Sequence, residues 1–167
     1  MTDLDHMCAR CAKHHDTCCR ASNIVVTEGD VERIAAQTGN TDFIEFRPWK
    51  QVDFDKQAAD PIFRDGVYRP DGTQRLLKHH SNGDCFFLGD AGCTLSGETR
   101  PLYCRLYPFD YSAEGLLPDA VPGCPLHLLP PGLDLFAALR MNREEAEKWR
   151  RQLYAELQSE RPLATLP

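Results

Sequence analysis

Apolar residues near the start of the chain recur at the spacing of one helical face. Thr27-Glu28-Gly29-Asp30 has the form of a capping box, and Gly39 offers a stop for the helix that follows. The apolar positions of this helix are Val31, Ile34 and Ala35. We therefore expect one amphipathic helix between the capping box and Gly39.

The stretch that follows gives weaker patterns. A second short helix is expected to begin at Thr41 and to end before Pro48, because the residue before a proline avoids helical geometry. Its buried residues would be Phe43, Ile44 and Phe46. Residues 50–66 are polar and have no clear period, so we expect a loop there.

Two β-hairpins are expected in the middle of the chain. Pro70-Asp71-Gly72-Thr73 is a turn signal between short apolar runs, and Gly89-Asp90-Ala91-Gly92 lies in the same way between two others. The expected hairpins pair residues 67–69 with 74–77 and residues 85–88 with 93–95.

Three helices are expected in the second half. The first begins with Pro101 at its first position and is stopped by Pro108. Residues 133–139 have a helical pattern, and Asn142-Arg143-Glu144-Glu145 caps a last helix that runs to about Glu160. One side of this last helix bears Ala146, Trp149, Leu153 and Leu157. We interpret the stripe as packing onto the core, and a surface for a protein or peptide partner is the alternative.

The composition is that of a folded domain without nucleic-acid or membrane chemistry. The chain has 167 residues, of which 42% are hydrophobic and 26% charged, and this length allows one apolar core. No apolar run approaches the roughly 18 residues that a membrane-spanning helix needs. The formal net charge of -6 argues against nucleic acid as the main partner, because phosphate binding needs a basic surface.

Eight cysteines are the unusual feature of the composition. The first residues include Asp3 and Asp5 and lack the basic and apolar regions of a secretory signal, so we expect a cytoplasmic protein. Thiols are kept reduced in the cytosol, and cysteines at this density there indicate metal ligands or redox centres. An extracellular protein with structural disulfides is the alternative.

The first four cysteines lie close together at the start of the chain. Cys8 and Cys11 have the C-x2-C spacing that lets a tight turn direct two sulfurs at one ion. Cys18 and Cys19 are adjacent, and adjacent side chains point apart in a strand or a helix. The doublet could therefore serve two sites or bridge a cluster, or one of the pair could serve only in packing.

The other four cysteines are Cys85, Cys93, Cys104 and Cys124. Cys85 and Cys93 bracket a turn and can approach each other, while Cys104 would lie in the first turns of a helix, where the helix dipole favours a thiolate. Arg100 and Arg105 could offset the negative charge of four thiolates around a metal, and pairing with carboxylates is the equal alternative for both.

Three motifs together indicate a family. The first is Cys11 with Cys18-Cys19-Arg20 and the downstream Ile24-Val25-Val26-Thr27, Asp30 and Ile34. The second is Cys85-Phe86-Phe87-Leu88 with Gly92-Cys93. The third is Arg100-Pro101-x2-Cys104-Arg105-x-Tyr107-Pro108-Phe109. Over about residues 8–124 the chain resembles the YkgJ-type cysteine-cluster family of zinc- or iron-chelating domains. It departs from the commoner C-x2-C-x2-C-C form, because Ala12 to Thr17 separate Cys11 from Cys18.

The resemblance implies that metal ions are the partners of the chain. The implied metal ligands are Cys8, Cys11, Cys18, Cys19, Cys85, Cys93, Cys104 and Cys124. Zn²⁺ takes four thiolates in a closed tetrahedron, and a [4Fe-4S] iron–sulfur cluster also takes four but tolerates irregular spacing. The irregular spacing and the resemblance favour an iron–sulfur cluster, and Zn stays open.

Histidines and catalytic motifs add little. His14 or His15 could replace a thiolate, although solvated loop residues are the more ordinary interpretation, and His79, His80 and His127 are expected to be solvated. The sequence has no Gly-x-Ser-x-Gly elbow, no phosphate-binding glycine loop and no His-Glu-x2-His motif. No catalytic residue can therefore be assigned.

We predict a single α+β domain over residues 1–167, organised around bound metal, with short β-hairpins and a C-terminal helix. Residues 8–124 would form the cysteine-cluster module, and residues 132–160 a helical appendage. The leading function is metal binding in a structural, redox or sensing role. The alternatives are a cluster-containing modification enzyme, such as a methyltransferase or an enzyme acting on a peptide, and a metal delivery or storage protein.

Overall fold

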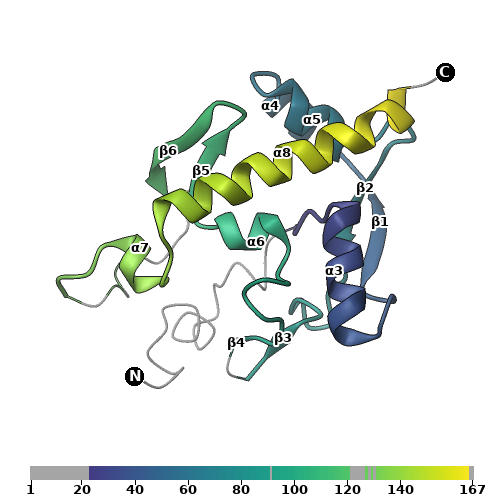
Figure 1. Ribbon diagram of the computed structural model, residues 1–167. Helices are drawn as coiled ribbons and strands as arrows, with labels where there is room; N and C mark the ends of the chain where they lie inside the picture. Colours follow the sequence, from purple (N-terminus) through teal and green to yellow (C-terminus); the bar gives the residue numbers. More distant parts are fainter. Residues whose placement is uncertain (1–22, 91, 121–126, 128, 130, 166–167) are drawn as a thin grey trace.

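The computed structural model describes residues 23–90, 92–120, 127, 129 and 131–165. Within them, the helices are α3 (Glu28–Thr38), α4 (Gln51–Lys56), α5 (Pro61–Val67), α6 (Leu102–Leu106), α7 (Leu135–Ala138) and α8 (Arg143–Thr165). The strands are β1 (Ile44–Pro48), β2 (Thr73–Leu77), β3 (Leu88–Gly89), β4 (Gly92–Cys93), β5 (Phe109–Ser112) and β6 (Gly115–Ala120). Antiparallel pairs join β1 to β2, β3 to β4 and β5 to β6, and α8 runs across the molecule (Figure 1). The predicted α+β class is confirmed.

Helix α3 begins and ends where the sequence predicts. The Thr27 hydroxyl accepts a hydrogen bond from the backbone N–H of Asp30, and the Asp30 carboxylate accepts one from the N–H of Thr27, both at 3.0 Å. Gly39 adopts the left-handed conformation (φ 67°) that closes many helices, and its N–H binds the carbonyl of Ala35. The two caps set where α3 begins and ends. Ile34, on the apolar side of this helix, is fully buried.

The helix expected over residues 41–47 is wrong, because this segment leads into strand β1. Ile44 lies opposite Leu77 of β2 in an antiparallel register. Phe43 is fully buried as expected, whereas Phe46 is 49% exposed. Aromatic and β-branched residues fit a half-buried strand, but the partner strand is distant in sequence and local spacing could not indicate it.

The first expected hairpin is wrong in its pairing. Val67 ends α5 instead of forming a strand, and β2 pairs with β1. Strand β2 also bonds to the chain just before α3, where Val25 bridges to Leu76 and the N–H of Leu77 donates to the carbonyl of Ile24 at 3.0 Å. Strand β2 is therefore held by two segments that are remote in sequence.

Residues 50–66 form helices α4 and α5 instead of the expected loop. The Asp60 carboxylate accepts a hydrogen bond from the N–H of Phe63 at 3.2 Å, and Pro61 occupies the first position of α5. An aspartate cap followed by proline is a helix-start signal, which the weak apolar pattern concealed. Helix α5 packs closely on α8, because a β-carbon at Gly66 would lie only 2.8 Å from that of Leu157.

Three other predictions are confirmed in the middle and second half of the chain. The second hairpin is β3–β4 in shorter form, with Leu88 opposite Cys93. Helix α6 begins after Pro101 and ends at Tyr107, whose extended backbone precedes a proline. Helix α7 matches the helical pattern noted there. No sequence pattern led us to expect the β5–β6 hairpin.

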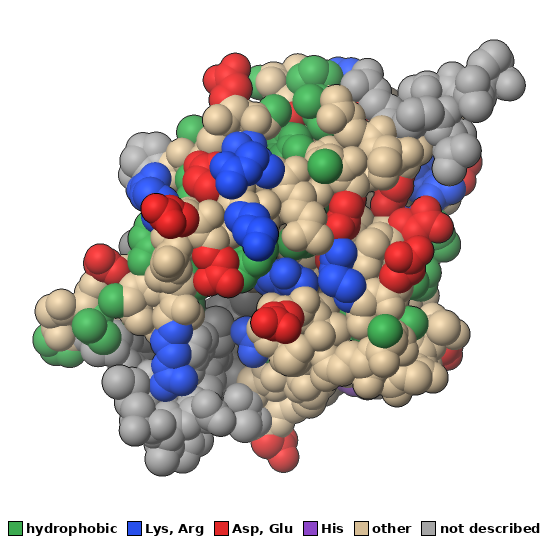
Figure 2. All heavy atoms as spheres, in the orientation of Figure 1, with side chains coloured by type: hydrophobic (Ala, Val, Ile, Leu, Met, Phe, Trp, Pro, Cys, Tyr) green, Lys and Arg blue, Asp and Glu red, His purple; other side chains and the backbone are tan. Residues whose placement is uncertain are grey.

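The apolar stripe of α8 packs onto the core, as predicted. The second hydrophobic cluster consists of Val25, Val67, Leu76, Leu102, Leu106, Ala146, Leu153 and Leu157, with Trp149 packed against it. Figure 2 shows acidic and basic side chains interspersed over the outer face of the molecule. Among the described residues, no helix combines the length and the apolar character that crossing a membrane would require.

Candidate metal centre

The structure gathers the described cysteines at one hydrophobic cluster. This first cluster consists of Ile24, Val26, Ile34, Phe43, Leu77, Cys85, Phe87 and Leu95. Cys85 belongs to it and is 4% exposed, and the half-buried Cys93 and Cys104 pack against it. Three predicted ligands from different elements therefore meet the same apolar surface.

The β3–β4 hairpin positions two of these cysteines. Cys93 lies in β4 opposite Leu88, and the N–H of Leu88 donates to the carbonyl of Cys85 at 2.9 Å. The backbone of Cys85 also forms an antiparallel bridge with His79. Cys85 and Cys93 therefore lie on either side of one turn, as their spacing in the sequence predicts.

Helix α6 positions the third cysteine. Pro101 precedes the helix with an extended backbone, and Cys104 is the third of its residues. Leu102 and Leu106 of the same helix are fully buried in the second cluster. The helix is therefore fixed from one side by hydrocarbon, while Cys104 packs against the first cluster on another side.

Arg100 and Arg105 hold the loop that leads into α6. The Nε of Arg105 donates to the carbonyl of Arg100 at 2.8 Å, and its Nη2 donates to the carbonyl of Glu98. The Nε of Arg100 donates to the carbonyl of Leu95 at 3.3 Å. Burial, assisted by the charge of Arg33, lowers the pKa of Arg105 from its ordinary value. Within the described residues both guanidiniums thus bind carbonyl oxygens rather than pairing with carboxylates.

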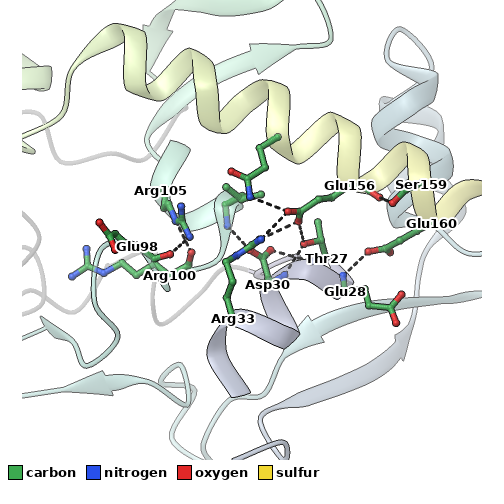
Figure 3. A network of polar contacts seen from close by, with 12 residues as sticks. Thr27, Glu28, Asp30, Arg33, Glu98, Arg100, Arg105, Glu156, Ser159 and Glu160 are labelled. Carbon is green, nitrogen blue, oxygen red and sulfur yellow. Dashed lines mark hydrogen bonds and ion pairs between the residues drawn. The ribbon is translucent and has the colours of Figure 1, made fainter. Parts of the chain in front are cut away.

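A buried carboxylate ties α3 to α6 (Figure 3). Asp30 is fully buried and accepts hydrogen bonds from the N–H of Thr27, from the N–H of Leu102 at 3.0 Å and from Arg33 at 2.7 Å. The sequence indicated the capping role of Asp30 but gave no signal for its bond to Leu102. Because Leu102 begins α6, this bond fixes the helix that bears Cys104.

The same network reaches α8 through Arg33. Its Nη1 and Nη2 donate to the two carboxylate oxygens of Glu156 at 2.8 and 3.0 Å. Burial alone would lower the pKa of Arg33, but its hydrogen bonds to Glu156 and Asp30 outweigh burial and raise the pKa. The guanidinium therefore stays charged and links two carboxylates from different helices.

The other predicted ligands lie outside the described residues: Cys8, Cys11, Cys18, Cys19 and Cys124. His14 and His15 lie outside them as well. His80 is exposed and stacks on Phe86 with ring centroids 5.6 Å apart, and His127 is exposed. Among the described residues alone, no three His, Cys, Asp or Glu side chains lie together as a metal site would require.

Comparison with known protein families shows that most of the chain matches a family model. Residues 7–125 match the family model named CxxCxxCC and described as "Putative zinc- or iron-chelating domain". The chain belongs to this family. Comparisons with curated proteins and with solved structures gave no significant match.

The CxxCxxCC match agrees with the family resemblance of the sequence. The description names zinc or iron, which agrees with the expected cofactor, Zn or an iron–sulfur cluster. The chemistry of the described donors fits such a metal, because Cys85, Cys93 and Cys104 are all thiols and both metals favour thiolates. The matched segment includes all eight cysteines of this CxxCxxCC chain.

Proposed function

We propose that this protein binds a [4Fe-4S] iron–sulfur cluster through cysteine thiolates and uses it in a structural, redox or sensing role. The observation that supports the proposal is that Cys85 belongs to the first cluster and that Cys93 and Cys104 both pack against it. A fourth thiolate would come from the cysteines at the start of the chain or from Cys124. We expect the protein to work in a reducing compartment such as the cytoplasm, where these thiols stay available.

The spacing of the described cysteines supports a cluster over a zinc ion. Structural zinc sites commonly take two close pairs of ligands, whereas these three cysteines come from a bridge, a strand and a helix. A four-iron cluster spreads its irons over several ångströms and accepts such separated ligands. When bound, a cluster of this type supplies reversible one-electron chemistry whose potential depends on the surrounding polarity and hydrogen bonds.

The burial of the site supports a protein that keeps its metal bound over one that delivers or stores metal. Cys85 is 4% exposed, and the loop before Cys104 is closed by the hydrogen bonds of Arg100 and Arg105. A delivery or storage protein needs thiols that exchange metal with solvent. The arrangement of these residues therefore favours a centre whose metal stays bound and stabilises the fold, by an amount on the order of 10 kcal/mol at comparable sites.

Anaerobic purification with quantified iron, acid-labile sulfide and zinc tests the proposal. We expect brown protein with absorbance around 400 nm and sulfide in proportion to iron, as cysteine-bound clusters give. Colourless protein with stoichiometric zinc would overturn the cluster and leave a structural zinc site. Protein that binds neither metal would overturn the whole proposal.

Cysteine variants test the ligand set. Cys93→Ser and Cys104→Ser are expected to lose metal and to lower the melting temperature, because each removes one thiolate. Ser96→Ala, a small change in the exposed loop between them, and His127→Ala should keep full metal content. Unchanged metal content in both cysteine variants would remove these residues from the ligand set.

A further inference from the structure

All five tyrosines of the chain line one cavity. Its volume is about 390 Å³, which lies within the range of small-molecule sites, roughly 300–1,000 Å³. The tyrosines come from four parts of the fold: Tyr68 follows α5, Tyr103 and Tyr107 belong to α6 and its end, Tyr111 lies in β5 and Tyr154 in α8. Tyr111 and Tyr154 make an edge contact, with ring centroids 6.2 Å apart.

Acidic side chains line the same cavity. Asp53, Asp60 and Asp110 contribute to its wall, and no Lys, Arg or His is found among the described residues that line it. Asp53 pairs with Lys56 at 3.7 Å. Asp60 accepts hydrogen bonds from Tyr154 and Phe63, but neither Asp60 nor Asp110 makes an ion pair with a described residue. Two carboxylates at the cavity are therefore without an ion pair to any described residue and can accept hydrogen bonds from a ligand.

Two arginines lie near these elements without lining the cavity. Arg64 of α5 binds Asp65 at 2.8 Å. Arg150 of α8 binds Glu147 at 2.8 Å and the carbonyl of Ala113 at 2.8 Å, and its guanidinium also lies over the Tyr154 ring, 6.0 Å from the ring centroid. Both guanidiniums already have carboxylate partners outside the cavity.

A mostly buried amide on the cavity wall is open to hydrogen bonding from the cavity. Gln74 of β2 is 7% exposed, lines the cavity, and its side chain makes no hydrogen bond with any described residue. The hydroxyls of Tyr68 and Tyr111 also make none within the described part of the chain. None of these polar atoms is sealed off without a partner, so a bound ligand can take the hydrogen bonds that water otherwise makes to them.

Burial, with the charge of Asp53, raises the pKa of Tyr68, so its hydroxyl stays a neutral donor and acceptor. Burial itself opposes any charged ligand, but the carboxylate charge that contributes to this shift repels an anion and attracts a cation.

We infer that the tyrosine-lined cavity binds an organic cation with a primary ammonium group. Its N–H donors would bond to Asp60, Asp110 and the amide oxygen of Gln74, and the aromatic rings would attract the charge and cover the alkyl part. A bare metal ion does not fit, because the described carboxylates do not form a ligating group of three.

Helix α6 borders both the cavity and the first cluster. Tyr103 of α6 and Tyr107, which directly follows the helix, line the cavity. Cys104 packs against the first cluster, and its electrostatic interaction with Tyr111 contributes to the raised pKa of that tyrosine on the cavity wall. The cavity therefore adjoins the position of one predicted metal ligand.

Titration of the full-length protein with pentylamine, followed by NMR, tests the inference. Pentanol supplies the same chain without charge, pentanoate supplies a negative charge, and pentyltrimethylammonium supplies a cation without N–H donors. We expect pentylamine to bind about tenfold or more tightly than each of them, as charge-assisted hydrogen bonds allow. Equal affinity for pentanol or for the quaternary ion would overturn the inference.

A lysine with blocked backbone ends identifies the source of the ammonium group. Affinity equal to that of pentylamine supports a lysine side chain of a polypeptide, and much weaker affinity supports a free amine. Either result is consistent with the ammonium chemistry of the cavity, provided that pentylamine itself binds.

Variants locate the binding. Asp60→Asn keeps the shape of the helix cap and removes the charge, and Asp110→Asn changes an exposed residue that should not affect folding. Each is expected to weaken pentylamine binding about tenfold, and Gln74→Leu by several-fold. Glu32→Gln neutralises an exposed carboxylate of α3 outside the cavity and is the matched control. If the two aspartate variants bind as the control does, the assignment is wrong.

Discussion

The buried carboxylate of Asp30 accepts a hydrogen bond at 3.0 Å from the backbone N–H of Leu102, which lies 72 positions later in the chain. The bond joins the start of α3 to the start of α6, the helix that bears Cys104. An acidic residue with no metal-binding role of its own thus determines where one of the predicted ligands lies.

Asp30→Ala is expected to destabilise the protein by about 3–5 kcal/mol, the range found when one partner of a buried charge pair is removed. The substitution leaves Arg33 and the N–H groups of Thr27 and Leu102 without their acceptor. Denaturant unfolding measures the loss, and metal content should fall with it. Asp42→Ala, at an exposed residue paired with Lys78, should cost below about 1 kcal/mol. Equal costs for the two variants would contradict the role assigned to Asp30.

Gly66→Ala is expected to destabilise the protein by about 1–3 kcal/mol, although alanine favours helices more than glycine does. The new β-carbon would lie 2.8 Å from Cβ of Leu157 and 3.2 Å from its carbonyl oxygen, so α5 and α8 must separate. Gly97→Ala is the matched control, because a β-carbon there meets no atom within 4 Å. Thermal unfolding of both variants checks the prediction, and a stable Gly66→Ala protein would show that the helices can shift freely.

Arg105→Lys is expected to release metal at a lower chelator concentration than the wild type. A lysine ammonium cannot replace the planar fork that reaches the carbonyls of Arg100 and Glu98, nor the contact of the guanidinium with the Trp149 ring at 5.7 Å. Chelator titration followed by metal analysis measures the effect. Arg151→Lys, at an exposed position of α8, should behave as the wild type. The prediction fails if both variants keep metal equally well.

The contribution of Glu156 to stability is expected to disappear in acid. Burial would raise the pKa of Glu156, but hydrogen bonds from Arg33, Thr27 and Gln152 outweigh it and lower the pKa below the ordinary value of 4.5. A lowered folded-state pKa contributes stability above the unfolded-state pKa, and that contribution is lost as the pH falls through the folded-state value. The stability gap between the wild type and Glu156→Gln should therefore be largest above about pH 5 and should narrow below pH 4.

Urea midpoints of both proteins from pH 7 to pH 3 measure this gap. Protonation of the cysteines at low pH affects the two proteins alike, so the difference between them isolates Glu156. A gap that stays constant over this range would show that the carboxylate is not held in its charged form by the network.

Local signals predicted the fold where the structure is itself local. The capping box at Thr27 and the left-handed Gly39 gave α3, and Pro101 and Pro108 gave the bounds of α6 within one residue. Strand β1 was mistaken for a helix because what decides it is pairing with β2, which spacing within the segment does not record. Helices α4 and α5 were missed because both are short and depend on packing by residues outside them. Helix α5 packs on α8, and Phe54 of α4 packs against Trp49 and Tyr68.

The sequence predicted the chemistry of the site but not the tertiary contacts that hold its residues in place. The cysteine pattern indicated metal binding, and the turn between Cys85 and Cys93 indicated how two of them approach. The bond from Leu102 to Asp30 and the tyrosine cavity both arise from tertiary contacts between distant segments. One sequence shows no periodicity that would assemble Tyr68, Tyr111 and Tyr154 in advance.

Helix α8 lies beyond residues 7–125, the segment that the family shares, yet it supplies Tyr154 to the cavity and Glu156 to the Asp30 network. A relative could therefore exchange its C-terminal extension and acquire a different small-molecule preference while keeping every sulfur atom. Proteins that share this cysteine pattern need not bind the same small molecule. Differences among them should be sought first in the C-terminal extension.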